Sequence, residues 1–403
     1  MYIKVLDINI TFVGALAWLC IGLWIIVFLV HALALTYGKL YLYSWRKLKD
    51  KGNVKDLPAV SIIKTVAGNN SNILSNLETV FLLEYPKFEV LICVQEEKNE
   101  LIPKIEEMMH DHPNVDSRIF VGAQSIGVNP KINNMIQCYD SIKYEYFWIC
   151  DSNILLHKES LLEIGYHLKP DVGLVHQLPY VGHNDQSFGS CFEKIHFGTQ
   201  HARWYLAFYA LGIPCVNGMS NIIKKKFLDD VGGLRPFSKY IAEDFFIGMS
   251  FSSRQIKILL STEPAIQSTT GVTVEKFINR MTRWQKLRLT MLASSFFEPF
   301  IECFLLGFLA SMSLWFLDVA SFFVAFVSHV TAWFLLDQLL LLIIEKKYSR
   351  LPPFFQRSYA WLLRELYTYR IFYNALFDRE IHWNNTTFTL KYGGIAVSSE
   401  KKS

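Results

Sequence analysis

The stretch from Thr11 to Leu35 constrains the fold of this chain most strongly, because its 25 residues include no Asp, Glu, Lys or Arg. About 20 apolar residues are enough to cross a lipid bilayer as a helix, so the stretch predicts a transmembrane helix with room to tilt. Lys4 is the one basic residue before this stretch. Six basic residues follow it, namely Lys39, Arg46, Lys47, Lys49, Lys51 and Lys55. The positive-inside rule then predicts an amino terminus outside or in a lumen, and a cytosolic segment after Lys39.

A second apolar region runs from Cys303 to Ile344 and contains only two acids, Asp318 and Asp337. Its length fits two membrane spans, and Asp318 lies near the middle, where a hairpin would turn. Asp337 would then lie within the membrane, where an acid is costly and by default functional. The alternative is a position near the interface, or a hydrogen bond to Ser328 or His329.

The segment from Phe354 to Phe377 is rich in Tyr, Trp, Phe and Leu, with arginines interspersed. This composition fits an amphipathic helix in the membrane interface and equally a helix packed on a soluble domain. The predicted division of the chain is a membrane anchor with its basic flank (1–56), a soluble catalytic domain (57–300), a transmembrane hairpin (301–345), and an interfacial helix with a tail (346–403).

The soluble domain alternates strand-like and helix-like segments. We expect strands at 58–64, 88–94, 118–121 and 146–150, and helices at 71–83, 102–110 and 131–140. Such alternation predicts an α/β fold with a mostly parallel sheet. Ligands bind such sheets at the carboxyl ends of the strands. Two of these ends are polar, namely Gln95 to Asn99 and Asp151 to Asn153.

Charge and cysteine content exclude several classes of protein. The net charge of +4 is too small to indicate a nucleic-acid partner. The seven cysteines include no CxxC pair, and their number is odd. Both facts argue against a disulfide framework or a structural zinc site, and they favour a reducing compartment.

Asp151-Ser152-Asn153 directly follows a predicted buried strand. An acid at the carboxyl end of a strand, with another oxygen ligand two residues later, can hold Mg²⁺ or Mn²⁺ against a diphosphate. Only Asp151 is a carboxylate, so Asn153 makes this metal site weaker than one with two acids. The structural alternative is a turn that begins with Asp.

Two adjacent carboxylates, Glu243 and Asp244, lie between apolar residues and two phenylalanines in Ile241-Ala242-Glu243-Asp244-Phe245-Phe246. An apolar setting and a neighbouring like charge both raise the pKa of a carboxyl group. A raised pKa suits a general base. The alternative is a helix N-terminus, where acids satisfy backbone N–H groups and the helix macrodipole.

Arg280-Met281-Thr282-Arg283-Trp284 lies just before the predicted hairpin. A helix would place Arg280 and Arg283 on one face, where two guanidinium groups can clamp phosphate oxygens. The alternative is membrane-surface binding by the two arginines and Trp284.

Together, these residues suit an enzyme that transfers a group from a nucleoside diphosphate to a lipid acceptor. Asp151 binds the metal and diphosphate, the arginines neutralise the leaving diphosphate, and a separate carboxylate accepts a proton. In this order and spacing, Asp151, Glu243-Asp244 and Arg280-x-x-Arg283-Trp284 resemble the D, D, (Q/R)xxRW series of family-2 glycosyltransferases.

Further motifs resemble those of ceramide glucosyltransferases, and the resemblance covers nearly the whole chain. They are Gly127-Val128-Asn129-Pro130-Lys131-Ile132-Asn133-Asn134, Trp148-Ile149-Cys150-Asp151-Ser152, Val172-Gly173-Leu174-Val175-His176, Leu178-Pro179-Tyr180-Val181, Phe197-Gly198-Thr199, Gly218-Met219-Ser220 and Tyr240-Ile241-Ala242-Glu243-Asp244.

The resemblance implies a GT-A (nucleotide-diphospho-sugar transferase) fold with one amino-terminal and two carboxyl-terminal transmembrane helices. It implies UDP-glucose as donor, ceramide as acceptor, a divalent metal (Mg²⁺ or Mn²⁺) and inversion at the anomeric carbon. It also implies a multi-pass protein of the Golgi or a related internal membrane, with its catalytic domain facing the cytosol.

The same resemblance assigns roles to individual residues. Asp244 is the implied general base on the ceramide primary hydroxyl, and Glu243 tunes or orients it. His201 matches a histidine near the active site, with packing or hydrogen bonding as its alternative role. The implied substrate-binding residues are Glu96, Asn99, Lys131, Asp151, Arg280, Arg283 and Trp284, and the implied metal ligands are Asp151 and Asn153.

One segment departs from the family pattern. The family places an Asp for the nucleoside at the end of the second strand, and this position falls on Asn99, with Glu96 and Glu97 as substitutes. A carboxamide can hydrogen-bond uracil or ribose but carries no charge. On this basis, Asn99→Asp is expected to tighten UDP binding modestly or leave it unchanged.

The departure at Asn99 keeps two alternatives open. One is a family-2 relative that uses another lipid acceptor or another UDP-sugar. The other is a catalytically weak paralogue that binds sphingolipid or a partner enzyme. A channel or transporter is not favoured, because the predicted spans offer no continuous polar path.

Overall fold

The computed structural model describes residues 2–5, 8–42, 53–182, 187–268, 270–345, 351–383 and 386–399. The chain forms two compact units. The helical unit comprises Met1–Tyr43, Gln186–Ala210 and Thr273–Asp378, and the sheet unit comprises Ser44–Asp185, Leu211–Val272 and Arg379–Ser403. The predicted 57–300 domain is therefore divided, because residues 186–210 and 273–300 cluster with the apolar helices. The basic residues at 46–51 lie outside the described residues.

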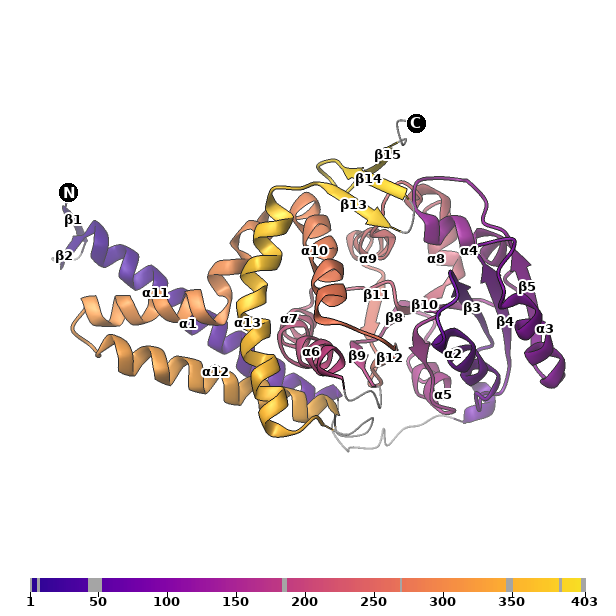
Figure 1. Ribbon diagram of the computed structural model, residues 1–403, viewed down its shortest axis with the longest axis horizontal. Helices are drawn as coiled ribbons and strands as arrows, with labels where there is room; N and C mark the ends of the chain where they lie inside the picture. Colours follow the sequence, from indigo (N-terminus) through magenta and orange to yellow (C-terminus); the bar gives the residue numbers. More distant parts are fainter. Residues whose placement is uncertain are drawn as a thin grey trace. The chain divides into compact units, whose positions relative to one another are not determined.

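Three apolar helices dominate the helical unit: α1 (Phe12–Tyr37), α11 (Cys303–Phe316) and α12 (Phe322–Glu345). They run side by side, α1 in indigo and the other two in orange (Figure 1). Within the described residues, the segments Phe12–Leu42 and Phe322–Glu345 are long and apolar enough to cross a membrane. A third span results if α11 is joined to η5 (Ala293–Ile301), from which it is bent by 67°. Asp318 lies in the predicted turn between α11 and α12, with a φ of 54°.

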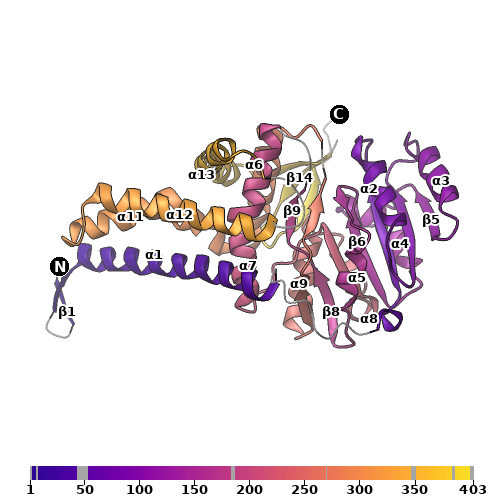
Figure 2. The same ribbon diagram turned by 90° about the horizontal axis from the view of Figure 1, so that it is seen from below.

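The remaining helices of this unit include α13, the predicted interfacial helix, which packs along α6 and α10. Figure 2 shows α13 beside α6. One side of α13 is exposed at Phe355 and Tyr359, whereas Arg364 is buried. Helix α13 therefore packs against other helices of its unit on one side and exposes aromatic side chains on the other. The elements are β1 (Tyr2–Val5), β2 (Ile8–Thr11), η1 (Gly38–Leu42), α6 (Phe188–His196), η3 (Phe197–His201), α7 (Ala202–Ala210), α10 (Val274–Met291) and α13 (Phe354–Leu376).

Asp337 is fully buried in α12 and accepts hydrogen bonds from four side chains. Its Oδ1 lies 2.9 Å from Arg203 Nη1 and 3.0 Å from His31 Nε2. Its Oδ2 lies 2.8 Å from Trp361 Nε1 and 3.0 Å from Arg364 Nη2. The predicted alternative partners, Ser328 and His329, are wrong. They lie about two helical turns away on the same helix, roughly 12 Å along its axis, and the partners of Asp337 come from other elements.

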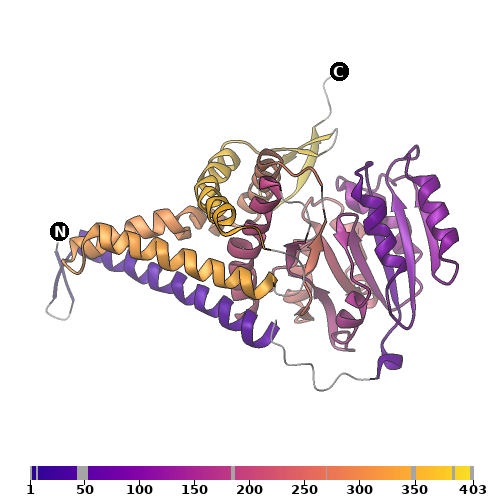
Figure 3. The same ribbon diagram turned by 60° about the horizontal axis from the view of Figure 1, so that its bottom comes forward.

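The sheet unit is built on seven strands in the order β11-β8-β10-β6-β3-β4-β5. Figure 3 shows strands of this sheet, with helices packed against them, on its right-hand side. Strand β10 pairs antiparallel with β6 and β8, and the other four pairings are parallel. The predicted α/β fold with a mostly parallel sheet is thus confirmed. The strands are β3 (Val60–Val66), β4 (Phe88–Val94), β5 (Asp116–Val121), β6 (Tyr146–Asp151), β8 (Val172–His176), β10 (Ser220–Lys224) and β11 (Lys257–Leu260).

Helices cover both faces of this sheet, because the central strands are apolar on both sides. One core places α2 (Asn72–Phe81), α3 (Ile102–Asp111) and α5 (Ser160–Gly165) against side chains such as Ile62 and Trp148. The other places α4 (Pro130–Asp140), α8 (Lys225–Asp229) and α9 (Glu243–Ser253) against Ile63 and Ile149. Strands β3, β4 and β6 are buried along nearly their whole length, as expected for strands covered on both faces, and β3 and β4 also bury polar side chains such as Lys64 and Glu89.

Short elements complete the sheet unit. Strand β12 (Ala265–Gln267) pairs with β7 (Ile154–Leu155) and β9 (Pro179–Val181). The carboxyl-terminal sheet contains β13 (Glu380–Trp383), β14 (Thr386–Leu390) and β15 (Ala396–Ser399). The amide of Ala396 donates to the carbonyl of Lys239 at 3.1 Å, so this sheet is joined to the segment that leads into α9. Two 3₁₀ turns, η2 (Val54–Asp56) and η4 (Arg235–Phe237), connect other elements.

Candidate active site

Asn129 connects the start of α4 to the start of α9. Its Oδ1 caps α4 by accepting from the amides of Lys131 and Ile132, at 2.8 and 3.1 Å. This is the N-cap role that Asn favours. Its Nδ2 donates to Glu243 Oε2 at 2.8 Å and to the carbonyl of Tyr240 at 2.7 Å. One fully buried carboxamide therefore fixes a helix end and orients a carboxylate.

Lys131 lies between two carboxylates. Its Nζ is 2.8 Å from Asp151 Oδ1, 3.5 Å from Glu243 Oε1, and within hydrogen-bonding distance of the Gly218 carbonyl. Burial lowers the pKa of Lys131, but Asp151 and then Glu243 raise it more, so the net pKa lies above its usual value. The ammonium is therefore a fixed positive charge that joins the end of β6 to the start of α9.

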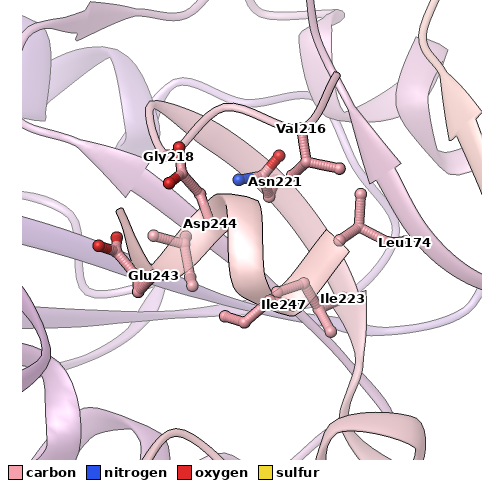
Figure 4. A pocket seen from close by; sticks show the side chains of 9 residues that line it. Leu174, Val216, Gly218, Asn221, Ile223, Glu243, Asp244 and Ile247 are labelled. Atoms are coloured by element: carbon pink, nitrogen blue, oxygen red, sulfur yellow. The ribbon is translucent and has the colours of Figure 1, made fainter. Parts of the chain in front are cut away.

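Glu243 and Asp244 form the first turn of α9, and both line a small pocket. The helix-terminus and functional interpretations of this pair are thus compatible. In Figure 4 the two carboxylates project from the helix start, and the apolar side of the pocket includes Leu174, Val216 and Ile247. A Cβ on Gly218 would lie 3.1 Å from Lys131 Nζ and 3.2 Å from Asp244 Oδ2, so the bare glycine permits this close approach.

The carboxyl group of Asp244 titrates near neutrality. Burial, followed by the adjacent Glu243 carboxylate, raises the pKa of Asp244 to about 7. The Lys131 ammonium and the Phe245 amide, which donates to Asp244 Oδ1 at 2.9 Å, oppose the rise. A general base works best with a pKa near the operating pH. The geometry therefore suits proton abstraction at Asp244.

The loop after β6 is held by a buried asparagine. Asn76 Nδ2 donates to the carbonyls of Ser152 and Ser268, at 3.0 and 3.2 Å. The amide of Asp151 donates to the Met219 carbonyl at 3.0 Å, which ties the strand end to the loop before β10. Asp151 is thus held at the carboxyl end of a central strand, where the parallel topology predicts ligand binding.

Asp151 and Asn153 together provide one carboxylate and one carboxamide. No cluster of three or more His, Cys, Asp or Glu side chains suitable for a metal ion occurs within the described ranges. Mg²⁺ is commonly bound by one or two carboxylates together with substrate phosphates. These residues therefore fit a metal that the donor phosphates and water complete, and they do not fit a metal site built from protein alone.

Glu96 and Asn99 form a hydrogen-bonded loop around Gly68. Glu96 accepts from the Gly68 amide at 3.1 Å, and Asn99 Nδ2 donates to the Gly68 carbonyl at 2.9 Å. Asn99 Nδ2 also donates to Glu96 Oε2 at 3.0 Å, and its Oδ1 accepts from the Leu101 amide at 2.9 Å. Asn99 thus uses both ends of its carboxamide to join the loops that follow β3 and β4.

Arg280, Arg283 and Trp284 lie on α10 of the helical unit, so the helix considered for this motif is present, and its role in binding phosphate stays a prediction. Arg280 Nη2 forms an ion pair with the buried Glu193, and the guanidinium lies 5.5 Å from the centre of the Phe197 ring. Burial, followed by Arg280, lowers the pKa of Arg283. Asp151, Glu243 and Asp244 belong to the sheet unit.

His201 ends the π-helix η3 of the helical unit. Its ring lies 5.2 Å from that of Phe197, 5.4 Å from that of Tyr205 and 6.4 Å from that of Trp284, measured between centroids. Burial, followed by Arg288, lowers the pKa of His201 to about 3, so the ring is neutral near pH 7. The packing role left open by the sequence is therefore observed, and a catalytic role for His201 stays a prediction.

Two site features were missed by sequence reasoning. Asn129 stood within a quoted motif, and the signal available was its position before Pro130, where an N-cap residue is expected. Gly218 also stood within a motif, but its closeness to Lys131 and Asp244 depends on the path of a loop between β-strands distant in sequence.

Sequence comparisons identify relatives over most of the chain. The model of glycosyl transferase family 21 matches residues 26–396. Ceramide glucosyltransferases 3 and 1 of Caenorhabditis elegans are each 35% identical, over 91% and 92% of this chain and 79% and 78% of their own length. The ceramide glucosyltransferase of Komagataella phaffii is 26% identical, over 82% of each chain.

A comparison of structures finds a mannosyltransferase from Pyrobaculum calidifontis, solved in complex with GDP-mannose and Mn²⁺. It is 14% identical, has a TM-score of 0.49, and covers 91% of this chain and 100% of its own.

Proposed function

We infer the reaction from family membership, because this chain belongs to glycosyl transferase family 21. Its relatives are named ceramide glucosyltransferases, and we conclude that this chain likewise transfers glucose to ceramide. The motif series in the sequence pointed to family 2, whereas the matching family carries the number 21. The finer proposal is a GT-A enzyme that uses UDP-glucose and inverts the anomeric carbon.

The observation that carries the mechanism is the Asp244 carboxyl group, with its pKa near 7, in a pocket beside Lys131. Asp244 accepts the proton of the ceramide primary hydroxyl. The hydroxyl oxygen then forms a bond to the anomeric carbon of glucose. The bond from that carbon to the diphosphate oxygen breaks, and its electron pair leaves with UDP. A positioned general base contributes roughly 10²- to 10⁴-fold to such a step.

Glu243 and Asn129 support Asp244. The Glu243 carboxylate lies next to Asp244 in sequence and keeps the pKa of Asp244 high. Asn129 and Lys131 both contact Glu243, and these contacts hold its carboxylate in a fixed position. Lys131 meanwhile holds Asp151, so the base and the donor site share one rigid connection.

Asp151 and Asn153 are the residues that would hold a divalent metal, and the metal would neutralise charge on the diphosphate. Lys131 adds a positive charge beside Asp151. Arg280, Arg283 and Trp284 are proposed to bind the leaving diphosphate. Arg280 is paired with Glu193, so it would have to exchange this partner for phosphate oxygens.

A membrane location agrees with a lipid acceptor. Two helices of the described chain are apolar enough to span a bilayer, and a third if η5 and α11 form one bent span. We propose the Golgi or a related internal membrane, with the sheet unit facing the cytosol. The positive-inside rule supports this orientation, because the basic side chains that follow α1 include Lys39 and Lys55 among the described residues.

The decisive experiment is a product assay with purified protein, UDP-glucose and ceramide. Glucosylceramide and UDP should appear in equal amounts, and chelation of divalent metal should weaken UDP-glucose binding. Absence of product with a folded protein would instead support a catalytically weak paralogue. Product from another lipid or another UDP-sugar alone would reassign the substrate.

A further inference from the structure

The helical unit contains a second pocket, bounded by α10, η5, α13 and the junction of α6 with η3. We call it the α10–η5 pocket. It is partly open to solvent and has a cavity volume of about 50 Å³. Its apolar lining includes Met281, Pro299 and Phe372, and its polar lining includes Gln285, Arg288 and Glu298. The lining thus combines apolar side chains with several polar groups that can orient a ligand.

The charges in this pocket are internally balanced. Arg288 Nε lies 3.1 Å from Glu298 Oε1, and Arg288 Nη2 lies 3.3 Å from Glu298 Oε2. His196, which also lines the pocket, has a pKa well below its usual value because of burial and then the neighbouring His201. The imidazole is therefore neutral. An uncharged polar ligand can therefore enter this pocket without breaking the ion pair of Arg288 with Glu298.

Gln285 provides a hydrogen-bond donor that no group in the described ranges accepts from. Its side chain is 3% exposed, and its Oε1 accepts from Arg288 Nη2. Its Nε2 is buried without a hydrogen-bond partner in the described part of the chain. The assignment of the two amide atoms follows from Arg288, which can only donate. A buried unpaired donor is costly, so an acceptor atom supplied by a ligand stabilises this arrangement.

The pocket also borders an element suited to lipid. Helix η5 exposes Phe296, Phe297 and Phe300, at 49%, 67% and 45%. Glu298 and Pro299, between these phenylalanines in sequence, line the pocket. Helix η5 is followed by α11, and the two together are long and apolar enough to form one bent membrane span. Exposed aromatic side chains next to a candidate span are typical of an interfacial segment.

We propose that the α10–η5 pocket binds the amide group in the head of the sphingolipid acceptor, with Gln285 Nε2 donating a hydrogen bond to the amide carbonyl oxygen. This inference rests on the proposed transfer to ceramide and adds the place where the acceptor head is recognised. The head is uncharged and carries a carbonyl, an amide N–H and hydroxyl groups. It can therefore satisfy Gln285 without disturbing the pair of Arg288 and Glu298.

The first test compares two changes of carboxamide to carboxylate on the same helix. Gln285→Glu keeps the size of the side chain and the acceptor for Arg288, but it removes the Nε2 donor. Asn279→Asp makes the same chemical change at an exposed position outside the pocket. We expect Gln285→Glu to raise the KM for ceramide about tenfold, as for one lost hydrogen bond. The KM for UDP-glucose should stay unchanged, and Asn279→Asp should alter neither.

The second test does not depend on turnover. A ceramide analogue with a photoreactive group near its head is cross-linked to the full-length protein in nanodiscs, and the labelled peptides are identified. Labelling of α10 or η5 that unlabelled ceramide suppresses supports the proposal. Labelling only elsewhere overturns it, as does suppression by phosphatidylserine as strong as that by ceramide. Thermal unfolding of Gln285→Glu is measured alongside, and Gln285→Met provides a second donor-free variant.

The two hypotheses fail in different ways. If wild-type protein transfers no glucose to ceramide, the proposed function fails, and the cross-linking still shows whether the pocket binds the head group. If wild type is active but a folded Gln285→Glu keeps its KM for ceramide, the acceptor site lies elsewhere.

Discussion

The carboxamide Nδ2 of Asn129 donates a hydrogen bond to Glu243 Oε2 at 2.8 Å, while Oδ1 of the same side chain caps helix α4. The position of the acidic pair therefore depends on a neutral residue more than 100 positions earlier in the chain. Glu243 in turn helps to raise the pKa of Asp244. We therefore expect Asn129 to act as a positioning residue for Asp244, the proposed base, through Glu243.

Asn129→Asp should move the acidic limb of the pH–rate profile to higher pH by about one unit. Aspartate keeps the helix cap but places a further negative charge beside Glu243, which raises the pKa of Asp244. Asn129→Ser keeps a capping oxygen and adds no charge, so it should lower kcat without a comparable shift. The measurement is kcat against pH for both variants. A profile for Asn129→Asp that superimposes on wild type would remove Asn129 from this role.

Asp244→Asn should lower kcat by roughly 10²- to 10⁴-fold, because the amide cannot accept the hydroxyl proton. UDP binding should persist, since Lys131 and Asp151 stay in contact with each other. Single-turnover product formation and UDP titration by calorimetry measure the two effects separately. Near-normal turnover, or loss of folding together with UDP binding, would contradict the assignment of the base.

The wild-type enzyme should show kcat/KM rising with pH up to about 7 and then levelling. Burial and Glu243 raise the pKa of Asp244 to about 7, and the base is active only when deprotonated. Below that pH, activity should fall about tenfold per pH unit. The profile is measured from pH 5 to 9 with subsaturating ceramide. A midpoint near pH 4, typical of an exposed aspartate, would show that another group is the base.

Asn99→Asp should weaken UDP binding, which reverses the expectation from the family motif. Asn99 Nδ2 donates both to the Gly68 carbonyl and to Glu96 Oε2. A carboxylate at this position would lose both donated bonds and repel Glu96. Calorimetric titration with UDP checks the sign of the effect. The double variant Asn99→Asp with Glu96→Gln should recover part of the loss, since it removes the repulsion. If Asn99→Asp alone bound UDP more tightly, the expectation from the family motif would be correct, and the hydrogen bonds of Asn99 would not determine UDP binding.

Asp337→Asn should destabilise the helical unit by about 3 kcal/mol, because it removes the carboxylate that Arg203 and Arg364 share. Unfolding of detergent-solubilised protein, followed by near-ultraviolet circular dichroism, measures the change. Asp318→Asn is the matched control, since this exposed turn residue has a positive φ that Asn also tolerates. Equal stability of the two variants would show that the Asp337 contacts contribute little.

The periodic segments of the fold could be predicted from sequence. The apolar run in β4 gave the strand at Phe88–Val94, and the uncharged run from Thr11 gave α1, because both signals are local. The hairpin turn at Asp318 followed from the same reasoning. The division into two units did not, since residues 186–210 and 273–300 join the apolar helices through packing between segments distant in sequence.

The candidate site could be predicted in part. Asp151 and the Glu243-Asp244 pair were found because a polar end to an apolar strand and an acidic pair among phenylalanines are local anomalies. The shared contacts of Lys131 could not be found in this way, because they depend on where β6, α4 and α9 meet. The partners of Asp337 were predicted wrongly for the same reason: nearness along one helix does not reveal partners on other elements.

The four hydrogen-bond donors to Asp337 become available at different times while the chain is being synthesised. His31 and Arg203 precede Asp337 in the chain, whereas Trp361 and Arg364 follow it. As α12 leaves the ribosome, its carboxylate can meet only the first pair. The carboxylate therefore reaches its full set of four donors only after α13 has been made. The packing of α12 in the helical unit is thus completed by the last helix of the chain, and a chain shortened before α13 would leave a buried acid with half of its partners.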